Sequence, residues 1–269
     1  MLTKFGAVTK MDQDSPLTNE QLFRVAPSIF AGAKHESRSE RYTYIPTIQV
    51  IEGLRSEGFF PFSVCQSKSR IEGKAEFTKH MIRLRQDGQI TAQVANEIIL
   101  INSHDGTSSY QMLAGMFRFV CQNGMVTGDT VEEIRVQHRG NIVDNVIDAA
   151  YTIVDQFDLA NESMGAMKSV QLSGPEQEIF ARAALALKYG EEQPITPRQI
   201  LLPRRLDDGK GDLWTQFNVV QENLLRGGQR GRASSGRKVT TRPVQSIDNN
   251  VKLNRALWIL ADEMAKLKA

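Results

Sequence analysis

The sequence predicts an α+β fold, with a β-β-β-α core at about residues 59–121 and a mostly helical C-terminal half. Apolar runs that alternate like strands cluster between residues 59 and 103. Beyond residue 140, apolar residues recur at helical spacing. The chain has 269 residues and is 41% apolar, which suffices for a normal buried core. We expect an α+β part with an antiparallel sheet over residues 17–140 and a helical part over 141–269 packed on it.

The N-terminal segment predicts two helices after a peripheral stretch over residues 1–16. In "LTNEQLFRVAP", Thr18 and Gln21 have the spacing of a capping box, which predicts a short helix that ends at Pro27. In "TIQVIEGLRSEG", apolar residues line one side of a second helix. Gly58 follows at the position of a C-terminal cap, so we expect this helix to end there.

Three strands are predicted between residues 59 and 103. They are "FFPFSVCQS", "KHMIRLRQ" and "NEIILIN", with a charged loop after the first and the turn signal "DGQ" after the second. Alternation in the second strand separates two faces. One face carries His80, Ile82 and Leu84, and the other carries Lys79, Met81, Arg83 and Arg85. A further strand is expected at "EEIRVQHRG".

The stretch "INSHDGTSSYQMLAGMFRFVCQNGM" predicts a polar corner that leads into a helix from Ser108 to Cys121. Its apolar residues fit helical spacing, and Asx side chains with a glycine favour a turn before it. Thr107 or Ser108 would cap the helix, whose free N–H groups can also hold a phosphate. The corner is therefore a cap, a cap with a phosphate contact, or a catalytic site. Its residues are Asn102, Ser103, His104, Asp105, Gly106, Thr107 and Ser108.

The C-terminal half predicts four helices and one basic loop. Helical patterns occur in "NIVDNVIDAAYTIVDQF", "SGPEQEIFARAALALKYG" and "DLWTQFNVVQENLLRGG", and a last helix begins at about Asn249. That helix carries a short leucine-rich seam, which fits packing on its own core or a contact between subunits. Between the last two helices, residues 226–242 hold six basic and no acidic residues among glycine and serine. We expect a flexible loop that orders on a phosphate backbone, with a solvated linker as the alternative.

Composition and motifs exclude several classes of function. The net charge is only +2, so affinity for nucleic acid must come from local clustering. No P-loop and no nucleophile-elbow motif occurs, and the histidines have no metal-ligand spacing. Cys65 and Cys121 fit free buried thiols in a reducing compartment. We therefore expect no cofactor or resident metal, no membrane span, and a cytoplasmic protein that is more plausibly a binding protein than an enzyme.

Three segments of the sequence carry a family resemblance. "NSHDGTSSYQMLAGMFRFVCQNGM", "IPTIQVIEGLRSEGFFPFSVCQS" and "KHMIRLR" together resemble the phage/plasmid-like proteins of domain of unknown function 932. The resemblance covers at least residues 40–140 and implies a setting on mobile genetic elements, without implying an activity. The β-β-β-α order is also similar, at the level of fold, to single-strand annealing proteins, which hold one strand in a basic groove.

These observations lead us to expect an ATP-independent DNA-binding protein of a mobile element. It would bind single-stranded DNA and promote annealing in recombination as a homo-oligomer. The alternatives are a metal-dependent nuclease at His104 and Asp105, and a protein-binding antagonist of host defence that uses the last helix. The candidate phosphate contacts are Lys68, Arg70, Lys74, Lys79, Arg83 and Arg85 near the hairpin, and Arg226, Arg230, Arg232, Arg237, Lys238 and Arg242 in the basic loop.

Overall fold

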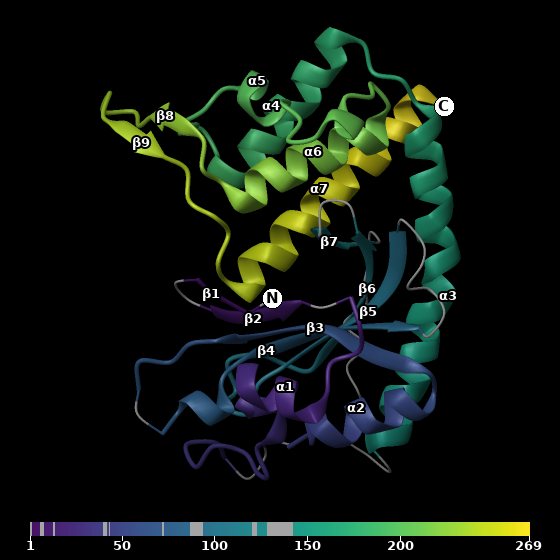
Figure 1. Cartoon of the computed structure of the whole chain (residues 1–269), viewed down its shortest axis with the longest axis vertical. Coiled ribbons are helices and arrows are strands. Elements are labelled where there is room, and N and C mark those ends of the chain that lie inside the picture. The colour runs from purple at the N-terminus through teal and green to yellow at the C-terminus, as the bar shows by residue number, and fades with distance from the viewer. Residues whose placement is uncertain are drawn as a thin grey trace. The chain divides into compact units, whose positions relative to one another are not determined.

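The chain forms two compact units in the computed structural model (Figure 1). The structure describes residues 2–5, 8–12, 14–39, 42, 44–71, 73–86, 94–119, 123–127 and 142–269. The first unit is Met1–Val120, Thr130–Phe157 and Gln245–Ile247, and the second is Cys121–Asp129, Asp158–Val244 and Asp248–Ala269. Strands dominate the first unit and helices dominate the second, so the class is α+β with the helices gathered in the C-terminal half.

The first unit is built on a curled antiparallel sheet in which each strand pairs with its neighbour in sequence, in the order β1-β2-β3-β4-β5-β6. The strands are β1 (Leu2–Phe5), β2 (Val8–Asp12), β3 (Phe59–Ser67), β4 (His80–Gln86), β5 (Val94–Asn102) and β6 (Gln111–Arg118). The register between β3 and β4 shifts between Pro61 and Ser63. Proline cannot donate to a ladder hydrogen bond, which fits an irregularity there.

Short helices cover the sheet of the first unit (Figure 1). They are α1 (Asn19–Val25), η1 (Pro27–Phe30), α2 (Thr47–Ser56) and η2 (Ala75–Phe77). The capping box predicted at Thr18 and Gln21 is present, and Gly58 follows α2 with a φ of 84°. The apolar side of α2 is buried in a core with Leu22 of α1 and Ile82 of β4. The two predicted helices are therefore confirmed.

The predicted helix over Ser108–Cys121 is wrong, because Gln111–Arg118 is strand β6. The strand pairs with β5 from Val94↔Arg118 to Ile101↔Gln111. Its residues from Met112 to Phe117 are buried on both faces of the sheet. A strand buried on both sides reads as a continuous apolar run, and such a run can match helical spacing by chance. Residues 120–122 lie outside the described part of the chain.

The N-terminal stretch is also corrected by the structure. Leu2–Phe5 and Val8–Asp12 are strands β1 and β2, and β2 pairs with β3 from Val8↔Ser67 to Asp12↔Ser63. Short strands near the edge of a sheet are held by backbone hydrogen bonds and need little apolar sequence of their own, so the segment carried a weak signal. The strand expected at "EEIRVQHRG", together with His138, lies outside the described residues.

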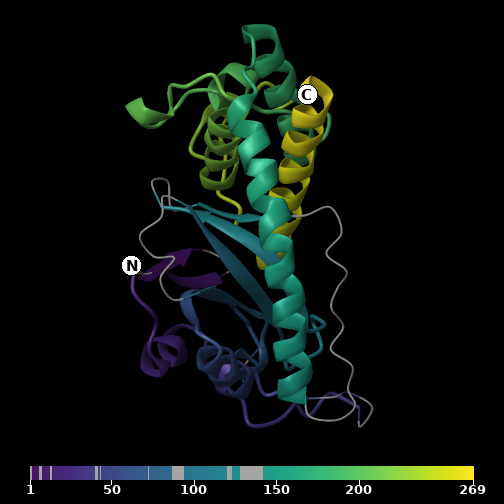
Figure 2. The same ribbon diagram turned by 90° about the vertical axis from the view of Figure 1, so that its right-hand side faces the viewer.

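The second unit consists mainly of helices. Its elements are β7 (Asn123–Val126), the C-terminal part of α3 (Ile142–Ser169), α4 (Gly174–Tyr189), α5 (Pro197–Ile200), η4 (Leu206–Asp208), α6 (Leu213–Arg226), β8 (Arg230–Arg232), β9 (Lys238–Thr240) and α7 (Ile247–Lys268). Figure 2 shows α3 as one uninterrupted helix, which belongs to the first unit up to Phe157. The described residues contain no helix that combines the length and the apolarity of a membrane span.

The helix ends and the last helix agree with the sequence pattern. The capping box at Ser173 and Glu176 is present at the start of α4, and Gly190 ends that helix with a φ of 63°. In α7 the first leucines of the seam, Leu253 and Leu257, are buried, whereas Leu267 is 81% exposed. The first part of the seam therefore packs within the protein's own core, and its end is exposed.

Candidate nucleic-acid interface

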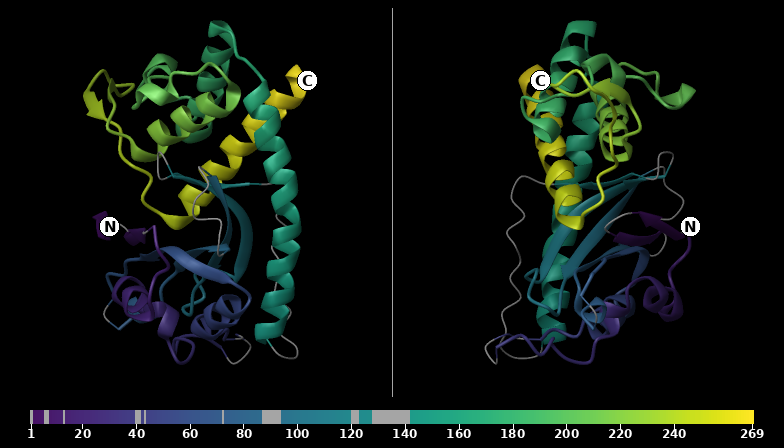
Figure 3. Two further views of the ribbon diagram at one scale, coloured as in Figure 1. Left: turned by 45° about the vertical axis from the view of Figure 1, so that its right-hand side comes forward. Right: turned by 90° about the vertical axis from the view of Figure 1, so that its left-hand side faces the viewer.

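The predicted basic loop forms a two-stranded ribbon, so its description as a loop is corrected. β8 and β9 pair antiparallel through Arg230↔Thr240, Gly231↔Val239 and Arg232↔Lys238. The hairpin stands out from the helices of its unit (Figures 1 and 3). A turn closes it, because Ala233 N–H donates to the Arg237 carbonyl and Gly236 adopts a φ of 80°. Gly236 in the turn and the backbone pairing of the two strands together specify a hairpin. The amino-acid composition of the segment did not indicate this hairpin.

The inner face of the ribbon is docked on the segment between α4 and α5. A Cβ on Gly231 would collide with the carbonyl oxygen of Pro194, and the Arg232 amide donates to that same oxygen at 2.9 Å. Gln199 Nε2 donates to the Arg230 carbonyl at 2.8 Å. Only glycine allows this close approach, so the ribbon is held in place by backbone contacts rather than by its side chains.

The outer face of the ribbon is cationic. Residues that pair across an antiparallel ladder share a face, so Arg230, Arg232, Lys238 and Thr240 point the same way, and all four are exposed. Arg232 and Lys238 are directly opposite each other, an arrangement of like charges that is unfavourable by itself. An anion bound on this face would relieve the repulsion.

The remaining basic residues of the segment lie at the tip or the base of the ribbon. Arg237 and Arg242 are exposed. Arg226, at the end of α6, is 48% exposed and pairs with Glu222 at 3.0 Å. The structure thus gathers the six predicted contacts of this segment on one hairpin and its base.

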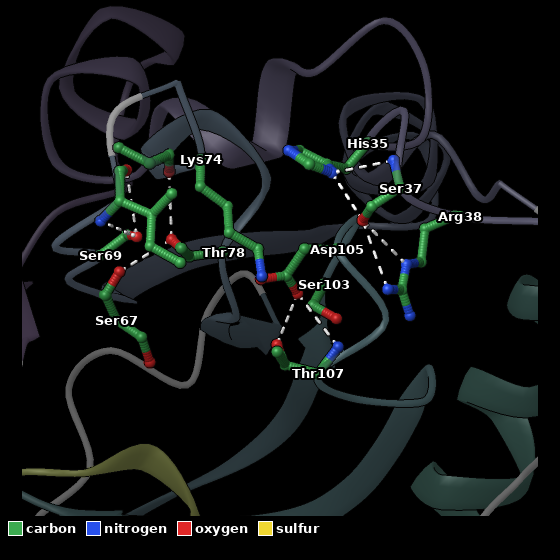
Figure 4. A network of polar contacts seen from close by, with 12 residues as sticks. His35, Ser37, Arg38, Ser67, Ser69, Lys74, Thr78, Ser103, Asp105 and Thr107 are labelled. Carbon is green, nitrogen blue, oxygen red and sulfur yellow. Dashed lines mark hydrogen bonds and ion pairs between the residues drawn. The ribbon is translucent and has the colours of Figure 1, made fainter.

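The candidate contacts of the first unit do not form one face. Lys68 and Arg70 are exposed in the loop after β3. Lys74, in the same loop, lies 3.7 Å from Asp105 Oδ2 (Figure 4). Lys79 is half-buried and already has a partner. Among the candidate contacts of the first unit, only Lys68 and Arg70 are exposed to solvent without a described partner.

Arg83 and Arg85 are buried and share one carboxylate instead of facing a phosphate. Arg83 Nη1 and Arg85 Nε each lie 2.8 Å from an oxygen of Glu97, a fully buried residue of β5. The Arg85 guanidinium also lies over the rings of Phe62, Phe117 and Phe119, at 4.8, 4.0 and 5.0 Å from their centroids. Such cation–π contacts favour a desolvated arginine. We therefore leave both residues out of the interface.

The polar corner is the loop between β5 and β6, where it forms a tight turn (Figure 4). Asp105 Oδ1 accepts from the amide and hydroxyl of Thr107 at 3.0 and 2.6 Å, and Ser103 exchanges hydrogen bonds with the backbone of Ser108. Gly106 has a φ of 74°, and the Arg38 side chain lies against it. These residues close a hairpin, and they cap no helix because none follows.

His104 points from this loop into a buried polar cluster. Its Nε2 lies 3.4 Å from Thr47 Oγ1, which also contacts His80 Nε2 at 3.0 Å and accepts from Asn102 Nδ2 at 3.0 Å. His80 Nδ1 lies 2.8 Å from Ser28 Oγ. Ser28 donates its hydroxyl proton to Gln66, so His80 Nδ1 is the donor to Ser28 and His80 Nε2 accepts from Thr47.

The two imidazoles are held neutral by their surroundings. Burial, followed by the neighbouring His104, lowers the pKa of His80 to about 3. Burial lowers the pKa of His104 to about 4, although Asp105 acts in the opposite direction. Such groups do not exchange protons near neutral pH, so they serve as fixed hydrogen-bonding partners rather than as a general acid or base.

The predicted alternative of a metal-dependent nuclease finds no donor set in the described part of the chain. There, no three of the histidine, cysteine, aspartate and glutamate side chains come together as metal ligands. Asp105 is committed to Thr107 and lies near Lys74. Cys65 is buried, and burial raises the pKa of its thiol to about 11, so it is not a reactive nucleophile.

Several residues of these clusters were missed by sequence reasoning. Ser28, Thr47 and Gln66 sit in ordinary helix and strand patterns, and nothing in the sequence indicated that they would meet the two histidines. Glu97 did carry a signal: a carboxylate inside the apolar run "NEIILIN" requires a buried cationic partner, and the neighbouring strand offered two.

Comparison with known proteins gives the family. Residues 34–258 match the family described as Domain of unknown function (DUF932). The chain belongs to the DUF932 family. It is 53% identical over 265 residues to the UPF0380 protein YafZ of Escherichia coli (strain K12), covering 98% of this chain and 97% of the relative. It is 52% identical over 265 residues to the UPF0380 protein YfjQ of the same strain, with the same coverage.

The DUF932 match includes the β3–β6 sheet, the polar corner and the ribbon. The family resemblance predicted from the sequence is therefore confirmed. No solved structure matches the chain. The resemblance in fold to single-strand annealing proteins rested on a β-β-β-α order that β6 removes, and it has no support.

Proposed function

We propose that this DUF932 protein binds DNA through the phosphate backbone, with the β8–β9 ribbon as its contact surface. The observation that carries the proposal is the cationic outward face of the ribbon. Arg230, Arg232 and Lys238 are exposed on it, and Arg232 lies directly opposite Lys238 across the ladder. A row of unneutralised cations on a hairpin fits a polyanion. The resemblance to phage/plasmid-like proteins adds a mobile-element setting, in which DNA is a common ligand.

The charge of the ribbon supports a backbone contact. Phosphate contacts fix position without reading sequence, and the guanidinium and ammonium groups of the ribbon can pair with phosphate oxygens. The hairpin is already folded, so binding does not have to order it and loses less conformational entropy than a disordered loop would. Single-stranded DNA is the first ligand to test, and promotion of annealing is the activity to test if it binds.

The decisive experiment measures how salt changes DNA affinity. Log affinity falls with log salt by about 0.7 per phosphate contact for a single strand and by about 0.9 for a duplex. We expect Arg230→Gln/Arg232→Gln to reduce that slope by about 1.4 on single-stranded DNA. Fluorescence anisotropy with the same oligonucleotide as a single strand and as a duplex gives both slopes and the strand preference.

A matched control removes two exposed cations elsewhere in the same unit. Arg182 on α4 and Lys252 on α7 are exposed, and Arg182→Gln/Lys252→Gln changes net charge by the same amount. This control should leave the slope unchanged. If both double variants reduce affinity equally, attraction is non-specific, and if neither does, the ribbon does not bind DNA.

Self-association is a separate part of the proposal. A ribbon on one 30.1 kDa chain contacts few phosphates, so a filament or ring would strengthen binding through multivalency. The end of α7 offers an apolar contact, because Leu267 is 81% exposed. Light scattering with and without oligonucleotide should detect an oligomer larger than a dimer that Leu267→Lys weakens, and a monomer under both conditions would contradict this.

A further inference from the structure

A pocket of about 630 Å³ lies at the base of the ribbon in the second unit. Its walls come from the end of α4, the following loop and the β9 strand with its continuation. The volume is within the range of sites that hold small organic ligands. From the outward face of the ribbon, Lys238 and Thr240 are part of the pocket lining, whereas Arg230 and Arg232 are not.

The charges in the lining favour an anion. Arg237, Lys238 and Arg242 line the pocket together with one carboxylate, Glu192. Three cations against one carboxylate leave two positive charges in excess. A phosphate monoester carries between one and two negative charges near neutral pH, whereas each diester of a nucleic-acid backbone carries one. The pocket therefore matches a monoester better than an internal backbone phosphate.

The other lining groups suit the nucleoside that would carry such a phosphate. Tyr189 contributes an aromatic ring and Thr240 contributes a hydroxyl, whereas the Thr241 hydroxyl is hydrogen-bonded to Gln229. An aromatic ring beside a cationic groove is a common platform for a nucleic-acid base. Glu192 can accept hydrogen bonds from a base amino group or a sugar hydroxyl.

The wall that carries Arg242 is fixed by backbone contacts. Lys188 donates to the carbonyl of Leu224 and, at 3.4 Å, to that of Arg242. A Cβ on Gly227 would lie 2.7 Å from the carbonyl carbon of Arg242, so the two segments approach closely. Gly228 N–H donates to the Thr241 carbonyl at 2.8 Å. A preformed wall lowers the entropic cost of binding a ligand.

We propose that this pocket binds a nucleotide through its phosphate monoester, as presented by a phosphorylated end of a nucleic-acid strand. The inference rests on the proposed function, because the same hairpin supplies the ribbon that would hold the rest of the strand. In this proposal the protein recognises the terminal phosphate of a strand in addition to contacting its phosphate backbone.

The test compares one short oligonucleotide with a 5′-phosphate, a 3′-phosphate or no terminal phosphate, each labelled internally, by fluorescence anisotropy. We expect a terminal phosphate to tighten binding about tenfold relative to the unphosphorylated form, the gain of about one charge-assisted hydrogen bond, and the 5′- and 3′-phosphorylated forms show which end is bound. Arg237→Gln/Arg242→Gln should abolish this preference. Arg230→Gln/Arg232→Gln, matched in charge, should weaken all three oligonucleotides and keep the preference.

The outcomes separate the pocket from the ribbon. Equal affinity for all three oligonucleotides overturns the pocket proposal and leaves backbone binding intact. If no oligonucleotide binds, calorimetric titration with a free deoxynucleoside 5′-monophosphate decides: binding that Arg237→Gln/Arg242→Gln removes supports a free nucleotide as the ligand, and absence of binding overturns the pocket. A preference that survives in the pocket variant also overturns it.

Discussion

Arginines on strands have opposite surroundings in the two units. Arg83 and Arg85 of β4 are buried and share the carboxylate of Glu97, whereas Arg230 and Arg232 of β8 are exposed on a face without an opposing carboxylate. Both pairs have the same alternating sequence pattern, Arg-x-Arg. The difference teaches that the neighbouring strand decides the surroundings: a carboxylate across the ladder makes a buried ion pair, and a lysine across it leaves an exposed cationic face.

The largest expected effect comes from removing the carboxylate. Glu97→Gln leaves two buried guanidinium groups without a counter-charge, and breaking a buried ion pair costs about 3–5 kcal/mol. We expect the free energy of unfolding, measured by urea denaturation, to fall by that amount. As the control, Glu178→Gln removes the exposed partner of Arg182 and should cost about 0.3–0.5 kcal/mol. Equal effects in the two variants would contradict the distinction between the buried and the exposed arginines.

The second prediction compares how pH changes the stability that the buried histidines contribute with how pH changes the DNA affinity of the ribbon. His80 is neutral in the folded state because burial lowers its pKa to about 3, whereas the unfolded chain takes up a proton near pH 6.5. The stability that the neutral His80 contributes is therefore complete above about pH 7 and is lost as the pH falls towards 3, with about 2 kcal/mol of it lost by about pH 5.

Urea midpoints at both pH values measure this dependence. His80→Gln, which keeps a donor and an acceptor, should reduce the pH dependence by about half, since His104 contributes in the same direction. DNA affinity of wild type should change less over the same range, because arginine and lysine side chains do not titrate there. A wild-type stability that is flat down to pH 5 would show that the histidines are protonated in the fold.

The smallest expected effect concerns the docking of the ribbon. Gly231→Ala forces the backbone away from Pro194 and breaks the hydrogen bond from the Arg232 amide, which should cost about 1 kcal/mol. The cations all remain, so any loss of DNA affinity would come from their misplacement. Gly165→Ala is the control: its Cβ enters open space in α3 and should stabilise the helix by about 0.5–1 kcal/mol. Unchanged melting temperature and affinity for Gly231→Ala would show that the docking is dispensable.

Local signals in the sequence were sufficient for most elements. Capping boxes at Thr18 and Ser173 and glycine stops at Gly58 and Gly190 located helix ends, because these features depend on nearby backbone groups. β6 could not be distinguished from a helix, because burial on both faces removes the period of two. The family followed from motif order, which the matched region confirms.

The candidate site was less predictable, because it depends on contacts between distant segments. The positive charge of residues 226–242 was visible in the sequence, but the ribbon geometry and its docking on Pro194 were not. Exposure of Arg83 and Arg85 was predicted from alternation alone, and this failed because the opposite face of β4 is also covered. Pairing of His80 with Thr47 joins residues 33 positions apart and leaves no local pattern.

The strictly sequential pairing of the sheet in the first unit has a consequence for synthesis. Each strand from β1 to β6 needs only the strand before it, so most ladder contacts close short loops and cost little entropy. β2 and β3 are the exception, since α1 and α2 intervene. The sheet can therefore form progressively as the chain leaves the ribosome. The early half of α3 arrives afterwards and brings Val146, Ala150 and Ile153 to the same core, which completes the burial of surface that the emerging sheet exposes.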